Sequence, residues 1–120
     1  MDRYTLVPEF NSLIPKFLSP ENVFGVYEEE TDSVSENIVK TLQEKGYQVK
    51  KVSQEIPSSI NVLCIIASPE AAWEKIKTSG VQKIWLEPGS ESQAAIDYCQ
   101  KNKIELVYYH SLTKAILDSK

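Results

Sequence analysis

Apolar segments of strand length alternate with amphipathic segments along most of the chain. Apolar or partly alternating runs predict five β-strands, at residues 23–27, 47–52, 62–67, 83–86 and 106–109. Segments with helical spacing separate them, as in the apolar stripe formed by Val34, Ile38, Val39 and Leu42. Such alternation is typical of parallel strands joined by right-handed crossovers. We therefore predict an α/β fold with a doubly wound parallel five-stranded sheet and helices on both faces.

Capping signals indicate where the helices begin. Two capping boxes predict helix starts at Ser33–Glu36 and Ser90–Gln93. Ser68 is predicted to cap a helix whose first residue is Pro69, where a missing N–H is harmless. A terminal helix is expected to begin at Ser111. The predicted helix ends lie near Gly46, Gly80, Asn102 and Leu117.

Residues 1–21 are interpreted as a helical preamble to a single domain at residues 22–120. Pro15 lies inside the apolar pattern and Pro20 follows it, so we expect a helix of one or two turns packed on the domain edge. The pattern consists of Phe10, Leu13, Ile14, Phe17 and Leu18.

Composition narrows the class of protein. The chain has 120 residues, of which 42% are hydrophobic and 25% charged, which favours one soluble globular domain. Its formal net charge of −4 argues against binding nucleic acid or an anionic membrane surface. No apolar stretch approaches the roughly 20 residues of a membrane span, and the first residues lack a signal-peptide layout. These features predict a cytoplasmic protein.

The residues that usually carry catalysis or metal binding are few and scattered. Cys64 and Cys99 fall in a predicted buried strand and a helix, outside any CxxC motif, so we expect reduced core thiols. His110 is the single histidine, which argues against a zinc site. It could act as a general base, but no nucleophile or acid is paired with it in the sequence. We assign no catalytic residue and no metal ligand.

In an open parallel sheet, ligands bind at the carboxyl ends of the strands. The relevant loops begin at Tyr27, Ser53, Ser68 and Glu87. The first loop carries the acidic run 28–32, where a diphosphate would meet like charges. We interpret this run as a solvated acidic lead-in to the next helix, with a cation or basic partner as the weaker alternative.

Two other loops have two interpretations each. Gly89 and Ser90 form either a tight turn with a helix cap or a contact for a polar ligand group. Ser68 and Pro69 either begin a capped helix or present N–H groups to an anion. Both loops lie where a crevice is expected.

Several segments resemble the small stand-alone coenzyme A-binding proteins, Rossmann-like domains also found within acyl-CoA synthetases and succinyl-CoA ligases. The resemblance is carried by the segments 38–49, 56–67, Ser68–Glu70 and Val81–Gly89, which include the Gly46–Tyr47 junction and Trp85. It implies a Rossmann-like fold and binding of the coenzyme's diphosphate and adenine by the loops named above.

The sequence departs from the family pattern mainly in those loops. The acidic residues 28–30 stand where the family has a small-residue turn, and Ser53-Gln54 stands in place of Asn-Pro. Ser68 replaces an arginine and Glu87 replaces a glutamine, while Gly89 is retained. The resemblance therefore supports the fold better than it supports coenzyme A (CoA) binding.

Three functional hypotheses follow. The first is a non-catalytic module that binds CoA or another adenine nucleotide, through candidate contacts at Tyr27, Thr31, Ser53, Ser68, Pro69, Gly89 and Ser90. The second is a degenerate family member that has no ligand and acts through protein contacts, for example as a homodimer. The third is a small enzyme that uses His110, and it has the least support.

Overall fold

The computed structural model describes residues 10–29 and 33–118, and it contains one parallel five-stranded sheet. The strands are β1 (Val23–Glu28), β2 (Gln48–Val52), β3 (Val62–Ile66), β4 (Lys83–Leu86) and β5 (Glu105–Val107). The helices are α1 (Phe10–Phe17), α2 (Ser33–Glu44), α3 (Pro69–Ser79), α4 (Gln93–Lys101) and α5 (Leu112–Asp118). The predicted α/β class and parallel sheet are confirmed.

In the strand order β2-β1-β3-β4-β5, the sheet is built outward in one direction from β1 to β2 and in the other from β3 to β5, so the strand order reverses between β1 and β3. The register aligns Val26 with Cys64, Cys64 with Trp85, and Trp85 with Val107. β3 is a run of apolar residues because both of its faces are covered; Val62, Leu63, Cys64 and Ile65 are fully buried. In sheets of this kind, the ligand crevice lies outside the strand ends at the reversal point.

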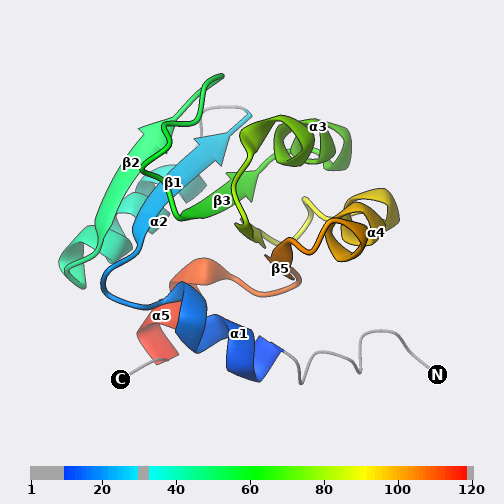
Figure 1. Cartoon of the computed structure of the whole chain (residues 1–120). Coiled ribbons are helices and arrows are strands. Elements are labelled where there is room, and N and C mark those ends of the chain that lie inside the picture. Colours follow the sequence, from blue (N-terminus) through cyan, green and yellow to red (C-terminus); the bar gives the residue numbers. More distant parts are fainter. Residues whose placement is uncertain (1–9, 30–32, 119–120) are drawn as a thin grey trace.

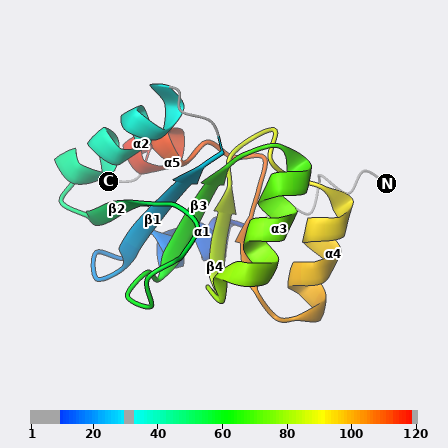
Figure 2. The ribbon, with the colours of Figure 1, turned by 90° about the horizontal axis from the view of Figure 1, so that it is seen from above.

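Helices cover both faces of the sheet, as predicted (Figures 1 and 2). On one face α1, α2 and α5 pack on the sheet, and their buried side chains are Phe17, Ile38, Leu42, Leu112 and Ile116. On the other face α3 and α4 contribute Ala72, Ile76, Ala95, Ile96 and Cys99. Two apolar clusters, one on each face, therefore make up the core.

The preamble helix is confirmed as the two-turn helix α1, and it reaches further into the core than an edge helix would. Phe17 is fully buried and packs edge-on against Trp85, with 6.0 Å between ring centroids. The side-chain amide of Asn22 donates hydrogen bonds to the carbonyls of Lys16 and Phe17. These carbonyls at the C-terminal end of α1 therefore have a hydrogen-bond partner. The domain boundary at residue 21 stays a prediction.

The start of α4 differs from the prediction. The helix begins at Gln93, and its cap is Ser92, whose hydroxyl accepts a hydrogen bond from Ala95 N–H at 3.1 Å. The capping box predicted at Ser90 is wrong because the Ser90 hydroxyl is buried and bonds elsewhere. By contrast, the predicted cap of α3 at Ser68 is confirmed.

The C-terminal elements also begin and end slightly away from their predicted bounds. β5 ends at Val107, two residues early, and Tyr109 has a left-handed backbone with φ of 65° that cannot continue a strand. α5 then begins at Leu112, and the hydroxyl of Ser111 accepts a hydrogen bond from Lys114 N–H. Ser111 therefore caps α5 rather than belonging to it.

Candidate functional site

A cavity of about 370 Å³ lies at the carboxyl ends of the central strands, at the predicted crevice. It is bounded by the loops that follow β1, β3 and β4, and its lining residues are Glu29, Ile66, Ala67, Ser68, Pro88, Gly89 and Ser90. Three of the predicted contacts, Ser68, Gly89 and Ser90, are thus brought together. Glu29 joins them, as a member of the acidic run that the sequence places in the first ligand loop.

Glu29 reaches from the end of β1 to the start of α3. Its Oε1 accepts a hydrogen bond from the backbone N–H of Ser68 at 2.8 Å. Ser68 is the N-cap of α3, and its own hydroxyl accepts from Ala71 N–H at 3.3 Å. A helix start is a position that favours negative charge. The carboxylate of Glu29 therefore occupies the place at α3 where an anionic ligand group would bind.

Glu28 contacts a side chain of α2. This half-buried residue ends β1, and its Oε1 accepts a hydrogen bond from the hydroxyl of Ser35, a fully buried residue in the first turn of α2. The interpretation of the acidic run as a solvated lead-in is therefore wrong for Glu28, whose carboxylate is partly buried against α2. Glu29 is exposed, as that interpretation expects, but its carboxylate contacts α3 instead of leading into α2. The predicted contact Thr31 lies outside the described residues.

The loop after β4 forms the opposite wall of the cavity. Gly89 has a φ of 98°, the left-handed conformation that its predicted role requires. Its N–H donates to Oε1 of Glu91 at 3.0 Å, so a second carboxylate lies on a backbone donor beside the cavity. The Ser90 hydroxyl accepts a hydrogen bond from Ala67 N–H at 3.1 Å and ties this loop to the end of β3. Ser90 is thus a structural contact of the crevice wall.

Tyr27 and Ser53 meet at a buried lysine. The ammonium of Lys75, on α3, lies 4.4 Å from the centroid of the Tyr27 ring. It donates hydrogen bonds to the carbonyls of Ser53 and Gln54 at 3.1 and 3.2 Å. Lys75 is only 9% exposed, so the charge is held by two carbonyl dipoles and an aromatic face. This cluster connects α3 to the end of β2, next to β1.

Glu87, the last residue before the β4 loop, points to the other face of the sheet. It is 6% exposed, and its Oε2 accepts a hydrogen bond from Leu112 N–H at 2.7 Å, at the start of α5. Burial raises the pKa of its carboxyl, although the hydrogen bond from Leu112 opposes the shift. Glu87 therefore belongs to the packing of α5 rather than to the crevice.

Pro69 and His110 take structural positions. Pro69 is the first residue of α3 and is exposed next to Ser68. Nδ1 of His110 lies 2.9 Å from the carbonyl of Tyr108, and the His110 carbonyl accepts a hydrogen bond from the indole of Trp85 at 2.8 Å. Within the described residues, no group of three or more His, Cys, Asp or Glu side chains is placed to hold a metal ion.

Sequence reasoning missed Lys75 altogether, and it missed the contact that Glu29 makes with α3. A signal for Lys75 was available, because it falls on the buried stripe of α3 with Ala72 and Ile76, at the i, i+3, i+4 spacing of core positions. For Glu29 the sequence indicated the loop but not the partner. Its partner Ser68 is 39 residues away, so the contact depends on the pairing of β1 with β3.

The comparison with family models identifies the class of protein. The model described as a CoA binding domain matches residues 22–115, which include the whole sheet and the crevice. The chain belongs to this CoA-binding domain family. None of the curated proteins compared with the chain matches it.

Solved structures support the same fold. A conserved hypothetical protein from Pyrococcus furiosus is 18% identical, with a TM-score of 0.67 over 78% of this chain and 97% of the other. Prb, a protein redesigned for binding, is 17% identical, with a TM-score of 0.69 over 92% and 93%. A protein from Thermus thermophilus is 12% identical, with a TM-score of 0.65 over 90% and 94%. At these identities the likeness concerns the Rossmann-like fold.

Within residues 10–29 and 33–118, none of the helices has both the length and the apolar character needed to cross a membrane.

Proposed function

We propose that the chain is a non-catalytic binding module, and that CoA or another adenine nucleotide enters the crevice between the loops after β1, β3 and β4. The observation that carries the proposal is the cavity of about 370 Å³ at the reversal point of the sheet, in a member of the CoA-binding domain family. Ser68, Gly89 and Ser90 are the contacts expected for the ligand.

Two carboxylates restrict what the crevice accepts. The backbone N–H groups of Ser68 and Gly89 are bonded to Glu29 and Glu91, at 2.8 and 3.0 Å. A ligand phosphate must displace at least one of these carboxylates to reach the same donors. Like charges 4 Å apart repel by about 1 kcal/mol in bulk water and about 4 kcal/mol near a protein surface. Binding of a diphosphate is therefore weak unless Glu29 turns outward.

The protonation of the two cysteine thiols and their position outside the crevice support a binding role rather than catalysis. Burial raises the pKa of Cys99 to about 11 and the pKa of Cys64 well above its usual value. Both thiols are then protonated at neutral pH, and a thiol is a poor nucleophile compared with a thiolate. His110 turns Nδ1 toward the Tyr108 carbonyl. None of these residues lines the cavity at the crevice.

The test is a titration of the isotope-labelled full chain with CoA, with ATP and NAD as comparison ligands, followed by calorimetry and by amide chemical shifts. We expect saturable binding of CoA and shift changes at Ser68, Gly89 and Ser90. The amides of Lys45 and Gly46, at the opposite end of α2, serve as the internal control. Neither heat nor shift changes at millimolar ligand would overturn the proposal.

The carboxylate contacts favour a second candidate, a ligand-free family member that acts through protein contacts. Carboxylates of the chain accept hydrogen bonds from backbone N–H groups at two helix starts, with Glu29 at α3 and Glu87 at α5, and Glu28 accepts one from the Ser35 hydroxyl in the first turn of α2. A domain whose own carboxylates take these positions needs no ligand anion there for its stability. If neither the wild type nor the Glu29→Gln variant binds CoA, this candidate is favoured over the first.

A further inference from the structure

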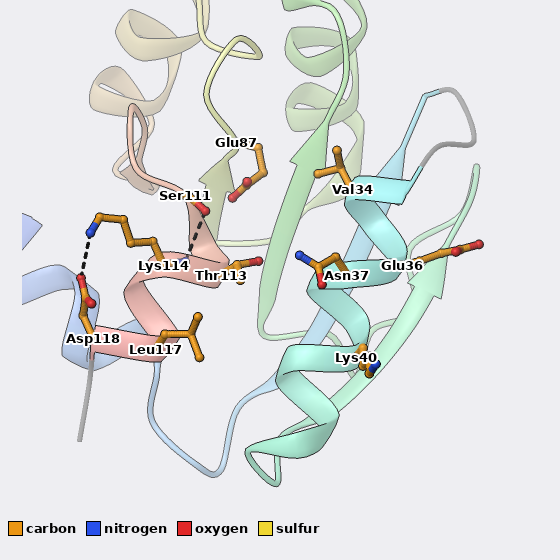
Figure 3. Close-up of a pocket in the computed structure, with 10 residues that line it drawn as sticks. All are labelled: Val34, Glu36, Asn37, Lys40, Glu87, Ser111, Thr113, Lys114, Leu117 and Asp118. Atoms are coloured by element: carbon orange, nitrogen blue, oxygen red, sulfur yellow. Dashed lines mark hydrogen bonds and ion pairs between the residues drawn. The ribbon is translucent and has the colours of Figure 1, made fainter.

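A groove of about 870 Å³ runs between α2 and α5, on the face of the sheet opposite α3 and α4 (Figure 3). Val34 and Asn37 line it from α2, and Thr113 and Leu117 line it from α5. Glu87 and Ser111 lie at the end of the groove nearest the carboxyl edge of the sheet. The groove is therefore separate from the crevice that we propose for the ligand.

The groove exposes apolar side chains that the core does not use. Among the described residues, three large hydrophobic side chains are exposed, namely Val34 (42%), Tyr109 (38%) and Leu117 (56%). Two of the three, Val34 and Leu117, line this one groove. On α5 the packing on the sheet is supplied by Leu112 and Ile116, which are buried. Leu117 thus presents a second apolar side, of the kind found at contact surfaces.

The pattern of charges around the groove is complementary to the same pattern on a second copy of the chain. Along α2 the exposed order is Glu36 then Lys40, and along α5 it is Lys114 then Asp118. Both helices follow strands of the parallel sheet and begin at its carboxyl edge. Starting from the carboxyl edge, the α2 side of the groove therefore carries a negative and then a positive charge. The α5 side carries a positive and then a negative charge.

This pattern matches a second copy turned by a two-fold rotation, in which each patch faces itself. With the axis along the groove, Glu36 of one copy meets Lys114 of the second copy, and Lys40 meets Asp118. With the axis across the groove, Glu36 meets Lys40 of the second copy. Opposite charges meet in both cases. A nucleic acid or an anionic membrane would gain no attraction from a neutral patch on a chain of net charge −4.

We propose that the α2–α5 groove is the interface of a homodimer, with Val34 and Leu117 as its apolar centre and the four charges as its rim. The Lys114–Asp118 pair, 3.5 Å apart with both side chains largely exposed, exchanges partners when the second copy binds. The proposal does not depend on whether the crevice takes a ligand.

Charge reversal gives a sharp test of the interface. The variant E36K/D118K makes the four rim charges positive, and K40E/K114E makes them negative. Light scattering coupled to size exclusion, over a range of protein concentrations at about 0.15 M salt, measures the mass of each. We expect the wild type to reach twice the chain mass, and each variant alone to stay at the chain mass with a dimer dissociation constant raised at least tenfold. An equimolar mixture of the two variants should restore the doubled mass.

Two further variants keep the test decisive. E44K/E55K reverses two exposed charges outside the groove and should dimerise as the wild type does. V34S/L117S removes the apolar centre without changing charge and should be monomeric, with its fold checked by circular dichroism. A wild type that stays monomeric at every concentration would overturn the proposal. So would charge-reversed variants that dimerise as tightly as the wild type.

Discussion

The carboxylate of Glu29 accepts a hydrogen bond from the backbone N–H of Ser68 at 2.8 Å, and this contact joins the loops that follow β1 and β3. These are the two neighbouring parallel strands between which the strand order of the sheet reverses. In a Rossmann-like domain this is where the ligand crevice forms, and the start of α3 is suited to an anion. In this member of the CoA-binding domain family, the chain supplies the anion itself.

Lys75 should be important for stability although it carries a charge inside the fold. Lys75→Met keeps the apolar stem and removes the ammonium, so the carbonyls of Ser53 and Gln54 lose their donor and the Tyr27 ring loses its cation. We expect the free energy of unfolding to fall by about 1–3 kcal/mol. Urea denaturation measures the change.

The control for Lys75 lies on the same helix. The ammonium of Lys77 lies 3.9 Å from the centroid of the Trp73 ring, but the residue is exposed and forms a surface ion pair with Glu74. Lys77→Met should change the free energy of unfolding by less than about 1 kcal/mol. Equal effects of the two substitutions would show that burial and the two carbonyls add nothing to the Lys75 contact.

Ser90 and Ser92 should respond differently to replacement by alanine. Ser90→Ala leaves Ala67 N–H without its acceptor and should cost about 1–3 kcal/mol. Ser92→Ala removes the cap of α4 and should cost about 1 kcal/mol. Amide hydrogen exchange separates them, because Ser90→Ala should speed exchange at Ala67 and Ser92→Ala at Ala95. Faster exchange at Ala95 in the Ser90 variant would contradict the assigned cap.

Glu87 should make stability depend on pH. Burial raises the pKa of its carboxyl above the ordinary value of 4.5, so the folded chain holds this proton more tightly than the unfolded chain does. The stability of the wild type relative to Glu87→Gln should therefore be highest below about pH 4.5, and it should be lost as the pH rises through the raised value.

Urea unfolding of the wild type and Glu87→Gln at a series of pH values measures this dependence. Glu44→Gln, at the exposed end of α2, corrects for the loss of one negative charge. A difference between the wild type and Glu87→Gln that stays constant from acidic to neutral pH would show that the buried carboxyl titrates as it does in the unfolded chain.

The fold was predictable because its signals are local. The apolar run of β3 and the Ser68–Pro69 start of α3 need no knowledge of distant residues. The start of α4 was mispredicted because Ser90 and Ser92 both precede Gln93 as possible caps. The choice between them depends on Ala67, 23 residues away, whose N–H binds the Ser90 hydroxyl.

The crevice was predictable in place but not in chemistry. Ser68 and Gly89 meet there because they follow parallel strands, and the rule for such sheets places their loops together. A local interpretation assigned the acidic run to the helix that follows it in sequence. The Glu29 carboxylate crosses instead to α3, a contact that exists only once β1 and β3 have paired.

The most direct test of the central claim is calorimetric titration of CoA into the wild type, Glu29→Gln and Glu44→Gln. Glu29→Gln keeps an oxygen for the Ser68 N–H and removes the charge that repels a diphosphate. We predict that Glu29→Gln binds CoA at least tenfold more tightly than the wild type, which corresponds to about 1.4 kcal/mol or more. Glu44→Gln should bind as the wild type does. Equal affinities for all three proteins, or no binding by Glu29→Gln, would contradict the account.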